Sequence, residues 1–287
     1  MKYVLQCEDS IEGIFSAVYA AWELKYGHAN TEIQVLGFQN CNIELFSEYI
    51  PLEPDAEKAQ KVLNTVRRVC SDMVYEALFR AACSDAADKA DAIYRYIQTA
   101  LRMGSKVRNH LTDPAVVRVM ELSRAVGNAE HHYLGFLRFI EIPGNILLAR
   151  FAPKPRLTGI IIPHFVDRFP EERFVIWDTV RNEAGVHVPG QTYLMLKLTE
   201  GQVAMLQQYA EDNMEAEQLW KTFVECISIK ERENKRLQQN NIPLHFRTYM
   251  PEFQKAEQSS DVSIQNGEKK EQNEKYNYKI SDESSCV

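Results

Sequence analysis

The chain lacks every short motif that would by itself specify a known chemistry. No Walker loop, GxGxxG, HExxH or GxSxG occurs in its 287 residues, nor a CxxxCxxC that could hold a radical-SAM cluster. The six cysteines form no CxxC pair and match no Cys/His spacing of a zinc or iron–sulfur site. We therefore expect no bound metal and no cofactor, and we expect the thiols to be reduced.

Long apolar runs are missing as well. No stretch approaches 18 continuous apolar residues, and the opening MKYVLQCEDS turns acidic too early for a signal peptide. These features predict a cytoplasmic protein with no membrane contact.

An excess of positive charge is also absent. The formal net charge is −7, which argues against a protein that coats nucleic acid with a uniformly basic surface. The charge is uneven, however, because residues 102–181 carry 12 Lys and Arg against 8 Asp and Glu. A basic middle in an acidic chain predicts a local anionic partner.

The hydrophobic periodicity predicts an α+β fold that is largely helical, with a small antiparallel sheet around residues 133–188. The helical pattern fills most of the first half, and an Asp-Pro start predicts a further helix over 113–127. The pattern then becomes strand-like over 133–142 and 146–151, which Pro143-Gly144-Asn145 would join as a hairpin. A helix is predicted over 157–169, and helices again from residue 199.

The composition divides the chain into two parts. Residues 1–254 are predicted to form a single α+β domain, with a helical N-terminal half, the small sheet and a helical C-terminal segment. Residues 255–287 are rich in Glu, Lys, Ser, Gln and Asn and contain few apolar side chains. Such a segment cannot bury enough apolar surface to fold, so we predict a disordered polar tail.

Residues 130–181 hold the strongest functional signal. Six arginines and three histidines alternate there with aromatic residues and short apolar segments. Arginine suits bidentate phosphate contacts, and an aromatic ring beside it offers a face for a base. The candidate nucleic-acid contacts in this stretch are Arg138, Arg168, Arg173 and Arg181. Internal ion pairs with neighbouring acids are the alternative for these arginines.

Four residues are candidates for acid–base chemistry. His132 precedes the predicted strand, where it could contact a phosphate or satisfy carbonyls at a helix end. His164 and Asp167 lie one helical turn apart, so the carboxylate could orient the imidazole, although a surface ion pair fits equally well. Asp178 ends a predicted strand, where aspartates often close a turn.

A second basic segment follows Trp220 and Phe223. Residues 220–247 hold six Lys and Arg against three acids. Arg232 and Lys235 are the candidate phosphate contacts of a basic helix there. The alternative is a solvated helix face with alternating charges.

Several segments together resemble a bacterial family described as DNA-metabolism or DNA-repair proteins. The segments are EDSIEGIFSAVYAAW from residue 8, HxxxxFLRF from 132, HFVDRFP from 164, FVIWDTVR from 174 and LWKTFVECISIKERENKRLQQNNIPLHFRTYMPEF from 219. The resemblance covers 1–254 in order and leaves out the tail. It implies a companion of a radical-SAM DNA modification or repair protein, and a relation to a domain fused to uracil-DNA glycosylases. The matched positions include Asp9, Glu12 and Gly13.

The sequence therefore favours a DNA-metabolism accessory protein that binds nucleic acid through an Arg/His/aromatic surface. It would act with a partner enzyme, a radical-SAM protein being one candidate. Two alternatives stay open at this point. One is a DNA repair enzyme acting on damaged nucleotides through its own His and Asp residues, and the other is a protein-interaction scaffold without DNA contact.

Overall fold

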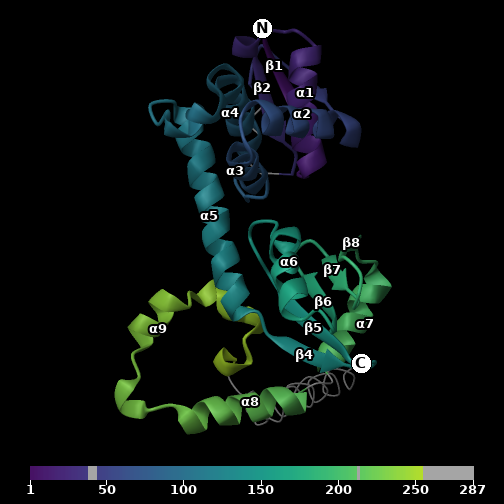
Figure 1. The fold of residues 1–287 in the computed structure, drawn as a ribbon, viewed down its shortest axis with the longest axis vertical. Coiled ribbons are helices and arrows are strands. Elements are labelled where there is room, and N and C mark those ends of the chain that lie inside the picture. The colour runs from purple at the N-terminus through teal and green to yellow at the C-terminus, as the bar shows by residue number, and fades with distance from the viewer. Residues whose placement is uncertain (38–43, 212–213, 255–287) are drawn as a thin grey trace, which may run out of the picture.

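The computed structural model describes residues 1–37, 44–211 and 214–254, which build two lobes joined by one long helix (Figure 1). The predicted tail lies outside the described residues, and the single-domain division of 1–254 stays a prediction. None of the described helices is both long and apolar enough to cross a membrane.

The first lobe contains a three-stranded parallel sheet in the order β2-β1-β3. Strand β1 (Lys2–Cys7) lies between β2 (Thr31–Val35) and β3 (Ser47–Pro51). Helix α1 (Ile11–Glu23) connects β1 to β2, and its start is fixed by Ser10, whose hydroxyl accepts the Gly13 N–H at 2.9 Å. The sequence pattern did not predict this parallel sheet as a unit.

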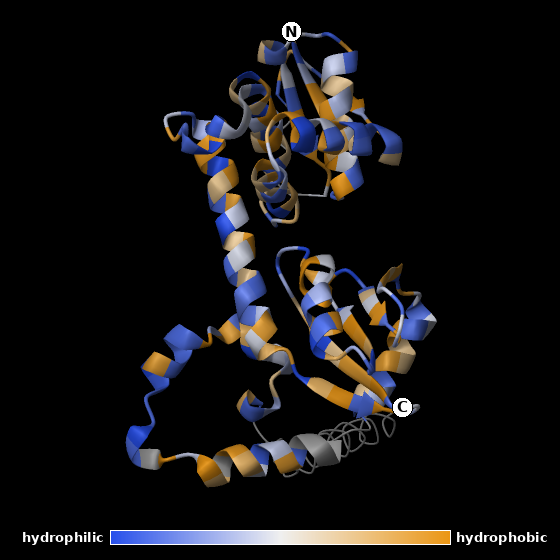
Figure 2. Ribbon diagram, viewed as in Figure 1, coloured by the Kyte–Doolittle hydropathy of each residue, from blue (hydrophilic) through white to orange (hydrophobic). Residues whose placement is uncertain are grey.

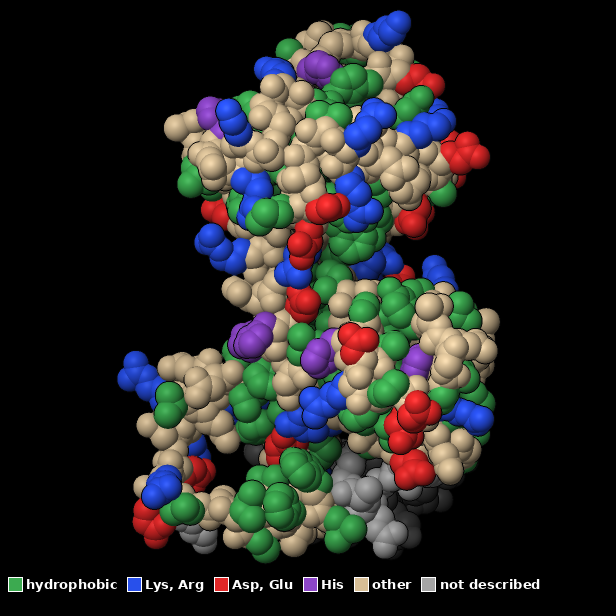
Figure 3. All heavy atoms as spheres, viewed as in Figure 1, with side chains coloured by type: hydrophobic (Ala, Val, Ile, Leu, Met, Phe, Trp, Pro, Cys, Tyr) green, Lys and Arg blue, Asp and Glu red, His purple; other side chains and the backbone are tan. Residues whose placement is uncertain are grey.

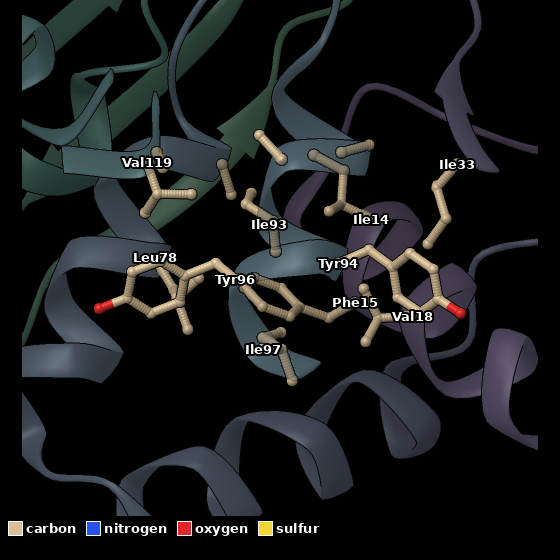
Figure 4. Packing of buried hydrophobic residues seen from close by; sticks show 14 of the residues in the cluster. Ile14, Phe15, Val18, Ile33, Leu78, Ile93, Tyr94, Tyr96, Ile97 and Val119 are labelled. Carbon is tan, nitrogen blue, oxygen red and sulfur yellow. The ribbon is translucent and has the colours of Figure 1, made fainter. Parts of the chain in front are cut away.

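Three further helices complete the first lobe, as predicted from their periodicity. They are α2 (Ala56–Val69), α3 (Asp72–Ala82) and α4 (Lys89–Met103). Figure 4 shows how Phe15, Ile33, Leu78 and Tyr96 converge from different elements on one buried cluster. This core holds β1 and the start of α1 in a fixed position.

Helix α5 (Pro114–Phe136) runs from the first lobe to the second (Figure 1). It begins at Asp113, as predicted, but continues nine residues beyond the predicted end at 127. The predicted strand over 133–142 is therefore wrong in its first half. Aromatic residues suggested a strand, but the helix persists because Tyr133 is buried against Phe151 and Phe246, which the local pattern cannot reveal.

The second lobe contains a five-stranded sheet in the order β4-β5-β6-β7-β8. Its strands are β4 (Phe139–Ile142), β5 (Ile146–Phe151), β6 (Arg173–Asp178), β7 (Glu183–His187) and β8 (Leu194–Lys197). The predicted antiparallel arrangement is only partly right, because β5 and β6 are parallel. Helix α6 (Thr158–Arg168) lies between these two strands in sequence. It serves as the crossover connection that lets β6 run in the same direction as β5.

Helices cover both faces of this sheet. Ile161 and Phe165 of α6 pack with Ile176 on one face. Leu206 of α7 (Glu200–Glu211) packs with Trp177 on the other. Neighbouring residues of β6 thus point to opposite cores, as expected of a strand buried on both faces.

The C-terminal segment forms an arm, which we define as residues 214–241. It comprises α8 (Met214–Ile227), a 3-10 turn at Lys230–Arg232 and α9 (Lys235–Asn241), and Figure 1 shows it curving away from the sheet. The chain then returns to the second lobe, where Phe246 is only 8% exposed. Trp220 donates its indole N–H to Glu252 at 3.2 Å, which ties α8 to the returning segment.

Candidate functional site at the junction of the two lobes

A cavity of about 370 Å³ lies where the lobes meet. The first turn of α1 and the end of α3 line it from the first lobe, and the first turn of α6 with β7 and β8 lines it from the second. Figure 3 shows basic and acidic side chains beside one another at the waist between the lobes. The position of the cavity is explained by the topology of the first sheet, in which β1 lies between β2 and β3. Ligand sites in such sheets lie beyond the carboxyl end of the strand where the strand order reverses.

A polar network joins the lobes beside this cavity. Lys89 is 1% exposed, and its ammonium donates to the Asp9 carboxylate at 2.6 Å and to the Ser84 carbonyl at 2.6 Å. Arg156 of the second lobe donates to the Asp9 carbonyl at 3.0 Å and forms an ion pair with Glu183. The Arg156 backbone N–H also bonds the Cys83 carbonyl at 2.8 Å. Because the Lys89 side chain is buried, its charge depends on the Asp9 carboxylate.

The loop between β1 and α1 is held closely at this edge. A Cβ at Gly13 would lie 2.6 Å from the Glu8 carbonyl oxygen, so only glycine allows the helix to begin so near the loop. This geometry gives a structural reason for glycine at a position that the sequence resemblance included.

The cavity wall is mostly apolar and carries two aromatic rings, Phe79 from the first lobe and Tyr193 from the second. Its charged lining residues balance, two acids against two bases: Glu12, Glu183, Arg156 and Lys197. Burial raises the pKa of the Cys83 thiol to about 11, so this lining residue is protonated at neutral pH and is a poor nucleophile.

A family model described as a domain of unknown function, DUF4130, matches residues 87–252. This match covers more than half of the chain. The chain belongs to the DUF4130 family. No curated protein matches it. Within this DUF4130 chain, Lys89, Arg156 and Glu183 lie inside the matched region, whereas Asp9 and Glu12 precede it. The cavity is therefore built jointly by the DUF4130 region and the residues before it.

Two of the predicted phosphate contacts in this DUF4130 chain are engaged inside the protein. Arg138 forms an ion pair with Glu252 at 2.7 Å and donates to the Gly135 carbonyl at 3.1 Å. Arg181 donates to the Asp178 carboxylate at 3.1 Å and to the Pro153 carbonyl at 3.1 Å. These contacts are the internal ion pairs that were the alternative to phosphate binding.

Arg168 and Arg173 are arranged differently. Both are exposed, at the end of α6 and at the start of β6, and neither has an ion pair within the described chain. Arg168 lies over the Phe169 ring at 5.5 Å. The exposed acids Asp167, Glu171 and Glu172 lie beside them in the sequence and reduce the positive potential of this end of the sheet.

The acid–base candidates are not brought together. His132 packs its ring 4.9 Å from that of Phe246. His164 and Asp167 share the exposed face of α6, but no hydrogen bond joins them in the described structure. Asp178 is fully buried and accepts the N–H groups of Val180 and Arg181, so it closes a turn. Burial raises the pKa of its carboxyl, against the opposing effect of the nearby Arg181.

Arg232 and Lys235 both lie on the arm and are exposed. Arg232 lines a second hollow of about 660 Å³, which is formed within the arm itself. The part of the chain that the structure describes offers neither residue an acidic partner. Sequence reasoning from single residues had missed Lys89, Arg156 and Glu183. Their spacing carries no signal, because the network joins positions 80 and 147 residues apart.

Proposed function

We propose that this DUF4130 protein is a DNA-metabolism accessory protein that binds nucleic acid through its arm and the adjoining second lobe. The observation that carries this proposal is the polar hollow of the arm. Its lining combines one arginine and one glutamate with several amide side chains: Arg232, Glu233, Asn234, Gln238 and Asn241.

This combination of side chains suits nucleic acid. Guanidinium groups bind phosphate or guanine, and amide side chains hydrogen-bond to bases and to the backbone. Asn234 already uses its side-chain oxygen to accept the Leu237 N–H at 2.9 Å, which starts α9 and fixes the geometry of the hollow. Lys235, the first residue of α9, adds an exposed cation next to Asn234 in the sequence. On the second lobe, Arg168 and Arg173 supply further exposed cations that form no ion pair within the described residues.

The accessory role is supported by the exposed apolar face of α8. Figure 2 shows hydrophobic residues along this helix, and Figure 3 shows hydrophobic side chains gathered over it. The exposed residues are Leu219, Trp220, Phe223 and Ile227. An apolar face of this kind is typical of a protein-binding surface. The sequence resemblance implies a radical-SAM enzyme as the partner. Because no hydrogen bond joins the His and Asp candidates in the described structure, a role beside such an enzyme fits better than independent catalysis.

A salt titration tests nucleic-acid binding by the arm. The anisotropy of labelled single-stranded and double-stranded oligonucleotides is measured with wild type and with the double variant Arg232→Ala, Lys235→Ala. If both residues contact phosphates, the variant binds all sequences more weakly. Its slope of log K against log salt on duplex is then smaller by about 2.

The matched control is Arg102→Ala with Lys106→Ala, which removes two exposed cations from the first lobe. It should bind like wild type. Equal weakening by both double variants would show that only net charge matters. If wild type binds neither oligonucleotide at low salt, the proposed function fails, and the α8 face then favours a scaffold without DNA contact.

A further inference from the structure

We infer that the cavity at the junction of the lobes receives a single nucleobase turned out of bound nucleic acid. This inference rests on the proposed function, because nucleic acid must be bound before one of its bases can enter. It adds a ligand class for a site that is separate from the phosphate contacts of the arm.

The size of the cavity agrees with this ligand. Its volume of about 370 Å³ lies within the range of small-molecule pockets, roughly 300–1,000 Å³. The hollow of the arm is larger, about 660 Å³, and is more polar in its lining.

The wall of the cavity suits a flat aromatic ligand. Phe79 and Tyr193 come from opposite lobes, and Ile11 and Ile160 add aliphatic surface. All four are partly buried side chains packed against the second core, so their positions are fixed. Enzymes and binding proteins that take up a displaced base hold it between aromatic and apolar side chains in this way.

The polar groups at the cavity suit the edge of a base better than a phosphate. The two acids and two bases among the lining residues balance, so the cavity offers no excess positive charge to an anion. The side chains of Glu12 and Lys197 are exposed, and neither forms a hydrogen bond or an ion pair within the described residues. A carboxylate accepts from an exocyclic amino group, and an ammonium donates to a ring nitrogen or a carbonyl.

The network around Arg156 holds the two walls at a fixed separation before any ligand arrives. Arg156 bonds both the β1–α1 loop and Glu183, so one side chain connects the two lobes at the cavity. A prearranged pocket loses less free energy to ordering when a base enters. The inference therefore needs no movement of the lobes.

Gly159 offers a way to fill the cavity without disturbing the core. It is the second residue of α6 and lines the cavity, and a Cβ there would meet no heavy atom within 4 Å. Gly159→Trp should therefore occupy the space of the base. The matched control is Gly201→Trp, at the second residue of α7, where a Cβ also meets nothing within 4 Å and which is not among the cavity's lining residues.

The experiment compares two labelled duplexes of equal length, one fully paired and one with a single unpaired base. An unpaired base costs less to displace, so wild type should bind the second duplex at least about tenfold more tightly. Gly159→Trp should bring the two affinities within about twofold and leave the fully paired affinity unchanged. Gly201→Trp should keep the wild-type ratio.

Three results distinguish the inference from the proposed function. If wild type binds both duplexes equally, or if Gly159→Trp keeps the full preference, the cavity does not receive a base, while binding by the arm still stands. If wild type binds neither duplex, both proposals fail. Should Gly159→Trp not fold, as judged by circular dichroism, the exposed variant Lys197→Ala replaces it. For the inference to stand, Lys197→Ala must then reduce the preference for the duplex with the unpaired base by at least threefold.

Discussion

Replacing Arg156 with alanine should weaken the junction between the lobes more than the loss of an ordinary surface ion pair. The change removes the hydrogen bond to the Asp9 carbonyl and the ion pair with Glu183. The side chains of Arg156 and Glu183 are 30% and 19% exposed, so solvent replaces the lost contacts only in part. Hydrogen bonds to charged groups contribute about 1.5–3 kcal/mol each, and some solvent compensation remains. We therefore expect a loss of about 3 kcal/mol in the free energy of unfolding.

Arg118→Ala is the matched control. Arg118 also forms ion pairs, with Asp88 at 2.7 Å and with Glu121 at 3.4 Å, but these three side chains are 39%, 56% and 57% exposed. Such surface pairs contribute about 0.5 kcal/mol. Arg156→Lys should fall between the two variants, because an ammonium lacks the planar fork that reaches two acceptors at once.

Urea titration followed by tryptophan fluorescence measures these differences. Trp22 reports on the first lobe, and Trp177 and Trp220 report on the second lobe and its arm. A loss of coupling between the lobes can therefore be seen as two separate transitions. If Arg156→Ala costs no more than Arg118→Ala, Arg156 does not hold the lobes together and the fixed cavity loses its physical basis.

Three further predictions concern buried or crowded positions. Burial raises the pKa of the Asp178 carboxyl, so the folded state binds the carboxyl proton more tightly than the unfolded state does. The free energy of unfolding of wild type, relative to that of Asp178→Asn, should therefore fall as the pH rises above about 4. If urea titrations show that this relative stability rises over that pH range, the ion pair with Arg181 outweighs burial. Because burial raises the pKa of the Cys83 thiol to about 11, iodoacetamide at pH 8 should alkylate the exposed Cys226 about 100-fold faster than it alkylates Cys83. Equal alkylation rates of the two cysteines, measured by peptide mass spectrometry, would contradict the burial of Cys83. Gly13→Ala should cost about 1–3 kcal/mol because its Cβ would meet a carbonyl oxygen at 2.6 Å, and a loss below about 0.5 kcal/mol would show that the loop adjusts freely.

Local signals were enough to predict most helices and their starts. Asp113 caps α5 where the sequence placed it, because capping depends on neighbouring backbone groups. The parallel pairing of β5 and β6 was missed, although the helix predicted between them could have revealed it, since parallel strands need such a crossover. The end of α5 could not be predicted, because Phe246 stabilises it from more than 100 residues away.

The candidate site was less predictable than the fold. Arginine-rich segments can face a phosphate or an internal acid, and the sequence does not distinguish the two. Arg138 pairs with Glu252, 114 residues further along, and Arg181 bonds carbonyls 26–28 residues before it. The charged network at the cavity is invisible for the same reason, because its members come from four separate elements or loops of the chain.

Photocrosslinking tests the central claim most directly, namely that nucleic acid lies on this protein with a base in the cavity between the lobes. An oligonucleotide with a single unpaired 5-iodouracil is irradiated in complex with wild type, and the attached peptides are identified by mass spectrometry. Stacking in the cavity predicts crosslinks at Tyr193 or Phe79, lost in Gly159→Trp and retained in Gly201→Trp. Crosslinks confined to residues outside the cavity and equally strong in both variants would contradict the account.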